Sequence, residues 1–403
     1  MRRPFITLLA ANALSVTGNV LSMLAVPWFV LESTGSAGLT GLAAFATTFP
    51  IVISAAFGGT LVDLLGFRWA SVLSDLTSGL VVLAIPALSL TTGLSYPILL
   101  LLLFVRWLAA TPGETARKAM LPDLSALGRV RISRATAAYD GVNRGATMVG
   151  APLAGILILW AGPSTLLIVD GVTFLLSALL ISAGVPHIDT GERESGGYLR
   201  DLRDGLTFLW RDRLQLSATG MIVVVNMLDT GVTQVLLALY ARDVAGDPRA
   251  FGLLTGGLGA GAVAGTIVYG AAGGRLPTRL TYGWCFLIAG VPRVLVLALG
   301  APFPVALGVA ALSGFAAGAI NPILGVIQFD RIPARLRARA LSAMTAAAYA
   351  AMPLGGLLAG SLTELTGLTT TLYAFTSVYL IASIPPFVCR AWRELDQPST
   401  AKT

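Results

Sequence analysis

Charged residues are scarce in this sequence. Asp, Glu, Lys and Arg make up only 12% of its 403 residues, whereas hydrophobic residues make up 55%. An ordinary soluble domain carries about 25% charged residues. The shortage of charge therefore excludes the ordinary soluble class and indicates a membrane protein.

Histidine and cysteine are almost absent as well. The one histidine, His187, cannot by itself build a metal centre or the Ser-His pairing of a hydrolase. Cys285 and Cys389 fall in predicted helices, so neither a disulfide framework nor a thiolate metal site is indicated. No stretch matches the H-E-x-x-H metal motif or the phosphate-binding loop G-x-x-x-x-G-K-[ST]. The sequence thus predicts no enzyme, no cofactor and no metal, and uphill transport would have to draw on an ion gradient.

Long apolar runs are what the sequence has in their place. A helix that crosses a bilayer needs about 20 mostly apolar residues. Twelve stretches fit this requirement, and they predict an all-α membrane protein. They lie near residues 5–31, 38–62, 70–91, 97–119, 137–160, 165–185, 215–240, 250–273, 280–300, 303–327, 341–361 and 367–390.

The basic residues are distributed unevenly between the predicted loops. With the N-terminus placed in the cytoplasm, 22 of the 27 Lys and Arg residues fall in cytoplasmic segments. Such an excess follows the positive-inside rule. It predicts a multi-pass protein of the plasma membrane with both termini in the cytoplasm. It also explains the net charge of +7 without a nucleic-acid partner.

The predicted helices divide into two halves of six. "GAPLAGIL" at 150–157 returns as "AMPLGGLL" at 351–358, in equivalent helices of the two halves. Two pseudo-symmetric six-helix bundles with substrate held between them form a secondary-transporter plan. The predicted division is a bundle at 1–186, a linker at 187–214 with an amphipathic surface helix, a bundle at 215–390 and a tail at 391–403.

The loop after the second predicted helix, "GGTLVDLLGFRWA", carries a recognisable motif. Gly59, Asp63, Gly66 and Arg68 resemble the G-x-x-x-D-x-x-G-R/K-R/K signature of the major facilitator superfamily, with Phe67 replacing the first basic residue. The resemblance implies a cytoplasmic latch between the two halves, and we expect Glu114 to complete it by pairing with Arg68.

Further segments narrow the resemblance to one branch of that superfamily. "GATMVGAPLAG" (145–155) is similar to the glycine–proline motif of antiporters through Gly145, Gly150, Pro152 and Gly155, with Ala151 intruding. "IVDGVTFLLSALLI" and "RLRARALSAM" look like the branch of macrolide-efflux pumps and siderophore exporters. That resemblance implies proton-driven export of small, mostly amphipathic molecules.

Polar side chains share faces of several predicted helices. A polar group inside a membrane must find a partner, so each has two interpretations, an interhelical hydrogen bond or the wall of a central cavity. The candidates for a substrate cavity are Asn12, Asn19, Asn226, Thr230, Arg144 and Tyr349.

Asp229 is the most informative of these intramembrane groups, because its two interpretations differ in function. A carboxylate at the centre of a membrane helix costs roughly 2.5–3.5 kcal/mol on insertion scales. One interpretation makes Asp229 a proton carrier, with Arg106 and Asp140 as further coupling candidates. The other makes it a fixed ion pair, for which Arg293 lies at similar depth. For Asp140 the four-residue spacing to Arg144 suits a pair within one helix.

The function expected from these observations is proton-coupled export of small amphipathic molecules, as in multidrug or antibiotic efflux. The expected partners are that substrate, protons and the lipid bilayer, and the expected state is a monomer. Three alternatives stay open: export of a siderophore or other natural product, flipping of a lipid or lysolipid, and gradient-independent facilitation.

Overall fold

The computed structural model describes residues 3–186, 206–272, 276–332 and 337–396. Within these ranges the side chains of 55–60, 63, 272, 326, 329–331, 337–339, 342 and 396 lie outside the description. The described chain is helical without strands, as the apolar runs predict. It divides into two compact units, one formed by residues 1–193 and 237–256 and the other by 194–236 and 257–403.

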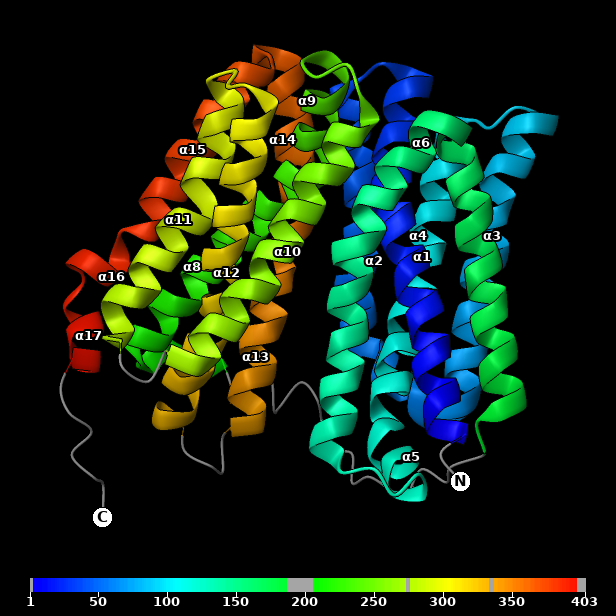
Figure 1. Cartoon of the computed structure of the whole chain (residues 1–403), viewed down its shortest axis with the longest axis horizontal. Helices are drawn as coiled ribbons and strands as arrows, with labels where there is room; N and C mark the ends of the chain where they lie inside the picture. Colours follow the sequence, from blue (N-terminus) through cyan, green and yellow to red (C-terminus); the bar gives the residue numbers. More distant parts are fainter. Residues whose placement is uncertain (1–2, 187–205, 273–275, 333–336, 397–403) are drawn as a thin grey trace. The chain divides into compact units, whose positions relative to one another are not determined.

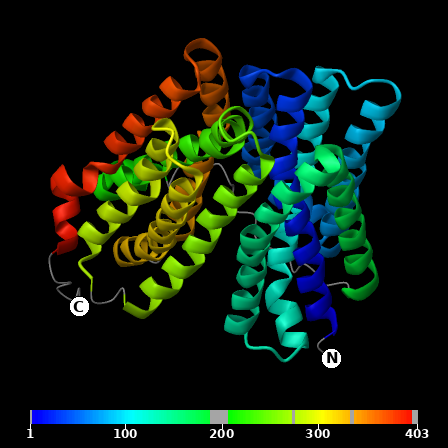
Figure 2. The same ribbon diagram turned by 45° about the horizontal axis from the view of Figure 1, so that its top comes forward.

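In the first unit the long helices α1, α2, α3, α4 and α6 lie side by side as a bundle, and the short helix α5 lies at one end of it (Figures 1 and 2). The segment α1 packs on α6, α3 packs on both α4 and α6, and α2 packs on α4. Their bounds are α1 (Arg3–Thr34), α2 (Ala37–Leu65), α3 (Phe67–Thr91), α4 (Tyr96–Ala119), α5 (Leu121–Leu127) and α6 (Ile132–Gly184).

The 53-residue helix α6 contains two predicted membrane crossings rather than one. A straight helix of this length would measure about 80 Å, far more than the roughly 30 Å of a bilayer core. Gly162 interrupts it with φ 75° and ψ 164°, a backbone conformation that glycine adopts without strain. Figure 1 shows α6 as two arms that run in opposite directions. The eleven described helices that are long and apolar enough to span a membrane count α6 once, so this bend accounts for the predicted twelfth crossing.

The second unit is built from α8 and most of the elements that follow it. The helix α8 packs on α13 and α14, and α11 packs on α12 and α15. The bounds are α8 (Arg213–Gly231), a π-helical turn η1 (Val232–Leu236), α9 (Leu237–Asp243), α10 (Pro248–Ala272), α11 (Thr278–Ala298), α12 (Phe303–Arg331), α13 (Arg337–Ala350), α14 (Met352–Thr366), α15 (Leu368–Ser383), α16 (Pro385–Val388), α17 (Arg390–Arg393) and the 3-10 turn η4 (Glu394–Asp396). Of these, α9 and the first part of α10 group with the first unit.

The predicted amphipathic surface helix falls largely outside the described residues. Only its end is described, where residues 206–211 are helical. Leu209 is buried against Ile332, Ala340 and Met344, so the described end packs on α13 and on the residue that follows α12.

Small residues allow α8 and α14 to approach closely, as expected where helices associate without a hydrophobic driving force between them. A methyl group built on Gly355 would lie 1.8 Å from the backbone oxygen of Met227. One built on Gly231 would lie 2.5 Å from the backbone oxygen of Gly355. Both contacts involve backbone atoms, which cannot move aside cheaply.

We therefore expect Gly355→Ala to lower the apparent Tm of the purified protein, because overpacking costs about 1–3 kcal/mol. Thermal unfolding in detergent measures the effect. Gly308→Ala is the matched control, since nothing lies within 4 Å of a methyl group at that position. Equal melting of the two variants would contradict the described packing of α8 on α14.

Candidate functional site

Arg106 on α4 lies in a closed network in the first unit. Its Nη2 atom is 2.9 Å from Asn19 Oδ1 and 3.2 Å from Asp170 Oδ2 on the second arm of α6. The hydroxyl of Ser22 donates to the same carboxylate. The side chains of Arg106 and Asp170 are 1% and 0% exposed. A guanidinium buried in this way cannot meet a substrate in this conformation, so Arg106 ties α1, α4 and α6 together.

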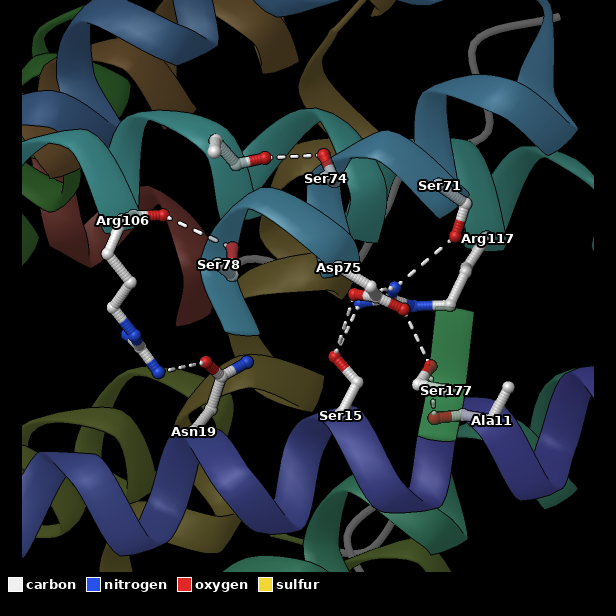
Figure 3. Close-up of polar contacts among 11 residues, drawn as sticks. Ala11, Ser15, Asn19, Ser71, Ser74, Asp75, Ser78, Arg106, Arg117 and Ser177 are labelled. Carbon is white, nitrogen blue, oxygen red and sulfur yellow. Dashed lines mark hydrogen bonds and ion pairs between the residues drawn. The ribbon is translucent and has the colours of Figure 1, made fainter. Parts of the chain in front are cut away.

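A second buried pair lies three turns further along α4. Arg117 Nη1 is 2.8 Å from Asp75 Oδ1, and Arg117 Nη2 is 2.9 Å from the hydroxyl of Ser15. Ser177 Oγ lies 2.6 Å from Asp75 Oδ2 and 3.0 Å from the backbone oxygen of Ala11. Figure 3 shows these side chains converging from α1, α3, α4 and α6.

Our sequence analysis missed this second pair. It named neither Arg117 nor Asp75 among its candidate residues. The signal was present, since Asp75 lies inside the apolar stretch 70–91 and Arg117 inside 97–119. A charge inside a membrane helix implies a partner on a neighbouring helix.

The predicted latch is described only in part. At Gly59 and Asp63 only the helical backbone is described. Gly66 has φ 73° and forms the turn between α2 and α3, which explains a glycine there. Arg68 donates to the backbone oxygen of Ser182, whereas Glu114 is exposed. The expected pair between Arg68 and Glu114 is therefore wrong for this conformation, because the guanidinium turns toward the end of α6.

The part of α6 that precedes Gly162 carries, or contacts, further predicted site residues of this unit. Asn143 Oδ1 accepts a hydrogen bond of 2.9 Å from Asn12 Nδ2. Asp140 and Arg144 are both exposed, and the contacts of the described residues include no ion pair between them. The expected intrahelical pair is thus absent here.

The antiporter-like motif on α6 contacts α10 within the first unit. A methyl group on Gly252 would lie 2.4 Å from the backbone oxygen of Ala151 and 3.0 Å from Gly155 Cα. One on Gly256 would lie 2.3 Å from Pro152 Cγ. A methyl group built on Gly150 would contact Val20, whereas one built on Gly145 would have no neighbouring atom within 4 Å. In this conformation three of the four motif positions, Gly150, Pro152 and Gly155, serve close helix packing.

Asp229 in the second unit has partners on two other helices. Arg293 of α11 and the hydroxyl of Tyr379 on α15 both donate to Asp229 Oδ1, and Arg293 Nη2 is 2.8 Å from Tyr379 Oη. The ion pair that we considered for Asp229 is therefore present.

The Asp229 pair differs from the two buried pairs of the first unit in its exposure. The side chain of Asp229 is 42% exposed and that of Arg293 is 11% exposed. Both line a cavity of about 90 Å³ within this unit, together with Val225, Phe286 and Gly290. The π-helical turn η1 begins three residues after Asp229. Single π-turns inside α-helices occur frequently at functional sites. The Asp229 pair thus borders open space, whereas the two pairs of the first unit are enclosed.

A second cavity of the same unit, of about 380 Å³, is lined by α8, α12 and α13. Asn226 and Tyr349, two of the predicted cavity residues, line it. Thr230 is buried and its hydroxyl donates to the backbone oxygen of Asn226 at 2.9 Å. Asn226 Nδ2 is 3.2 Å from the backbone oxygen of Ala348.

A membrane-helix chain with paired internal charges and a polar cavity has the features of a secondary transporter. A family model described as "transmembrane secretion effector" matches residues 1–402. Over 405 residues the chain is 32% identical to the multidrug efflux pump Tap of Mycobacterium tuberculosis (strain ATCC 25618 / H37Rv), covering 98% of this chain and 95% of that protein. It is 30% identical over 407 residues to the pump of the same name from Mycolicibacterium fortuitum, covering 99% and 98%.

Among solved structures, the nucleoside transporter NupG has the same fold, with a TM-score of 0.76 at 11% identity, covering 98% of this chain and 99% of that one. The chain belongs to the transmembrane secretion effector family, within the major facilitator superfamily.

Asp170→Asn tests the structural role of the Arg106 network. Removing one partner of a buried ion pair leaves an uncompensated charge and costs about 3–5 kcal/mol. We expect a large fall in folded yield and in apparent Tm, measured by size-exclusion chromatography and thermal unfolding.

The control is Asp247→Asn, which breaks the exposed pair of Asp247 with Arg249. Exposed pairs contribute little to stability, so this variant should behave as the wild type. A stable Asp170→Asn protein would mean that Arg106 does not depend on this carboxylate.

Proposed function

We propose that this protein exports small amphipathic molecules across the plasma membrane, coupled to the entry of protons. Two relatives of nearly full-length coverage are multidrug efflux pumps by name, which supports drug efflux as the class of transport. The distribution of basic residues supports a plasma-membrane protein with both termini in the cytoplasm. We expect it to act as a monomer.

The observation that carries the proposed coupling is the partial exposure of Asp229. A proton carrier must be reached by water, and it must change its contacts when it gains a proton. Two observations support this role for Asp229: its side chain is 42% exposed, and its carboxylate accepts hydrogen bonds from Arg293 and Tyr379. Asp75 and Asp170 are only 2% and 0% exposed, so neither is accessible in this conformation.

Protonation of Asp229 would remove the negative charge that holds Arg293. The contacts of α8 with α11 and α15 would then weaken, which links a proton to the packing of the second unit. Asp140 is the second candidate, because it is an exposed carboxylate on α6. Arg106 is a poor candidate, since an arginine stays protonated in proteins and this one is buried.

Asp229→Asn in everted membrane vesicles tests the coupling. Under an imposed pH gradient we expect wild-type vesicles to accumulate ethidium or chloramphenicol, and the variant to lose at least nine-tenths of that accumulation. Asparagine keeps the size of the side chain and removes the titratable group. Asp247→Asn, which changes a partly exposed carboxylate outside the spans, should leave accumulation unchanged.

Other outcomes would assign the coupling to another residue or indicate another type of transport. Accumulation that survives in Asp229→Asn but is lost in Asp140→Asn would move the coupling to α6. Movement of either probe by wild type without a gradient would indicate a facilitator or a lipid-flippase type of mechanism. No movement of either probe would overturn proton-driven drug export and favour a siderophore exporter.

A further inference from the structure

A cavity of about 460 Å³ lies in the second unit, where the helical segment 206–211 meets the start of α8. Its described lining consists of Phe208, Arg211, Asp212, Arg213, Leu214 and Glu394. Arg213 is the first residue of one candidate membrane span, and another candidate span ends at Val388, shortly before Glu394. The cavity therefore lies close to the level at which membrane helices begin and end.

The segment that follows α15 is fixed against the start of α8. Trp392 on α17 is fully buried, and its ring stacks on that of Tyr282 at a centroid distance of 5.1 Å. Its Nε1 atom donates to Ser217 Oγ on α8 at 2.9 Å. These contacts hold the end of α17 next to the cavity. Arg390 and Arg393, on either side of Trp392, are exposed.

Positive charge dominates the part of the cavity formed by residues 211–213. Arg211 and Arg213 are exposed and line it, and none of the ion pairs between described side chains includes either of them. Asp212 lies between them, and its Oδ1 atom accepts from the backbone nitrogens of Leu214 at 3.0 Å and Gln215 at 3.1 Å. The N-terminus of α8 thus compensates this carboxylate.

The arginines of α17 add to this charge. Arg390 and Arg393 also take part in none of those ion pairs. Glu394 is the one other carboxylate in the described lining. Four guanidinium groups are therefore accompanied by a single carboxylate outside the helix cap. Such a surface suits a phosphate group, because a guanidinium can bind two phosphate oxygens through parallel hydrogen bonds.

Apolar and aromatic side chains lie beside the arginines. Phe208 and Leu214 line the cavity, and the side chain of Trp210 is 71% exposed. Tryptophan is enriched at the interface between membrane and water. A free phosphate ion would use the arginines alone, whereas a phospholipid presents a phosphate next to acyl chains. The combination of charge and apolar surface therefore favours a lipid.

We propose that this cavity binds the headgroup of an anionic phospholipid, with Arg211 and Arg213 binding its phosphate. The inference goes beyond the proposed export function. The proposed topology places the cavity at the cytoplasmic leaflet, where basic pockets at the ends of membrane helices bind anionic headgroups. A zwitterionic headgroup fits less well, because its own cation would meet the same arginines.

Binding of tritiated phosphatidylglycerol to the immobilised full-length protein in detergent, measured by scintillation proximity, tests the inference. We expect saturable binding to the wild type, and weaker binding of tritiated phosphatidylcholine. The double variant Arg211→Gln/Arg213→Gln should raise the Kd for phosphatidylglycerol about 30-fold, since each basic residue near a membrane surface contributes about 5-fold.

Arg131→Gln/Arg134→Gln is the matched control. Both arginines are exposed at the start of α6 in the first unit, on the side proposed as cytoplasmic, and neither lines this cavity. The control removes the same amount of charge and should keep the Kd of the wild type. Thermal unfolding of both double variants verifies that they are folded.

An equal Kd in the wild type and Arg211→Gln/Arg213→Gln would overturn the inference, and so would an equal rise in both double variants. Equal affinity of the wild type for the two lipids would also overturn it, because the unpaired arginines would then select no charge. Inorganic phosphate separates a lipid from a soluble anion. We expect an equimolar amount to leave phosphatidylglycerol bound, whereas its displacement would assign the cavity to a soluble phosphate compound.

Discussion

Local compensation of charge inside the membrane is the constraint on which the rest of this structure depends. A lone charge in the bilayer is expensive, so an arginine buried between membrane helices requires an acidic partner close by. Arg106, Arg117 and Arg293 each have one among the described residues. Each partner comes from a different helix, and these pairs therefore decide which helices lie together. The glycine contacts then set how closely the helices approach.

Corresponding helices of the two units carry polar clusters that differ in their exposure. In the first unit, Ser15, Asp75 and Ser177 meet from its first, third and sixth predicted spans. In the second, Asp229, Arg293 and Tyr379 meet from the equivalent spans of its own half. The first cluster is closed to solvent and the second is open to a cavity. Corresponding spans thus form a buried cluster in one unit and a partly exposed ion pair in the other.

The sequence predicted the spans well, because the length and apolarity of a membrane helix are local properties. It also singled out Asp229 and offered Arg293 as its partner, since intramembrane charges are rare enough to be matched by depth. It failed where pairing depends on how helices face one another. Arg68 turns to Ser182 rather than to Glu114, and Arg106 reaches Asp170, which was not among the predicted site residues. Helix rotation, which decides these contacts, is set by packing across the whole unit.

The central claim is that Asp229 is the membrane carboxylate that exchanges a proton. Infrared difference spectra of the purified protein between alkaline and acidic pH report the carbonyl stretch of protonated carboxyl groups. We expect a band in the wild type that disappears in Asp229→Asn and persists in Asp140→Asn. A band that is unchanged in Asp229→Asn would contradict the account, because the proton would then bind elsewhere in the protein.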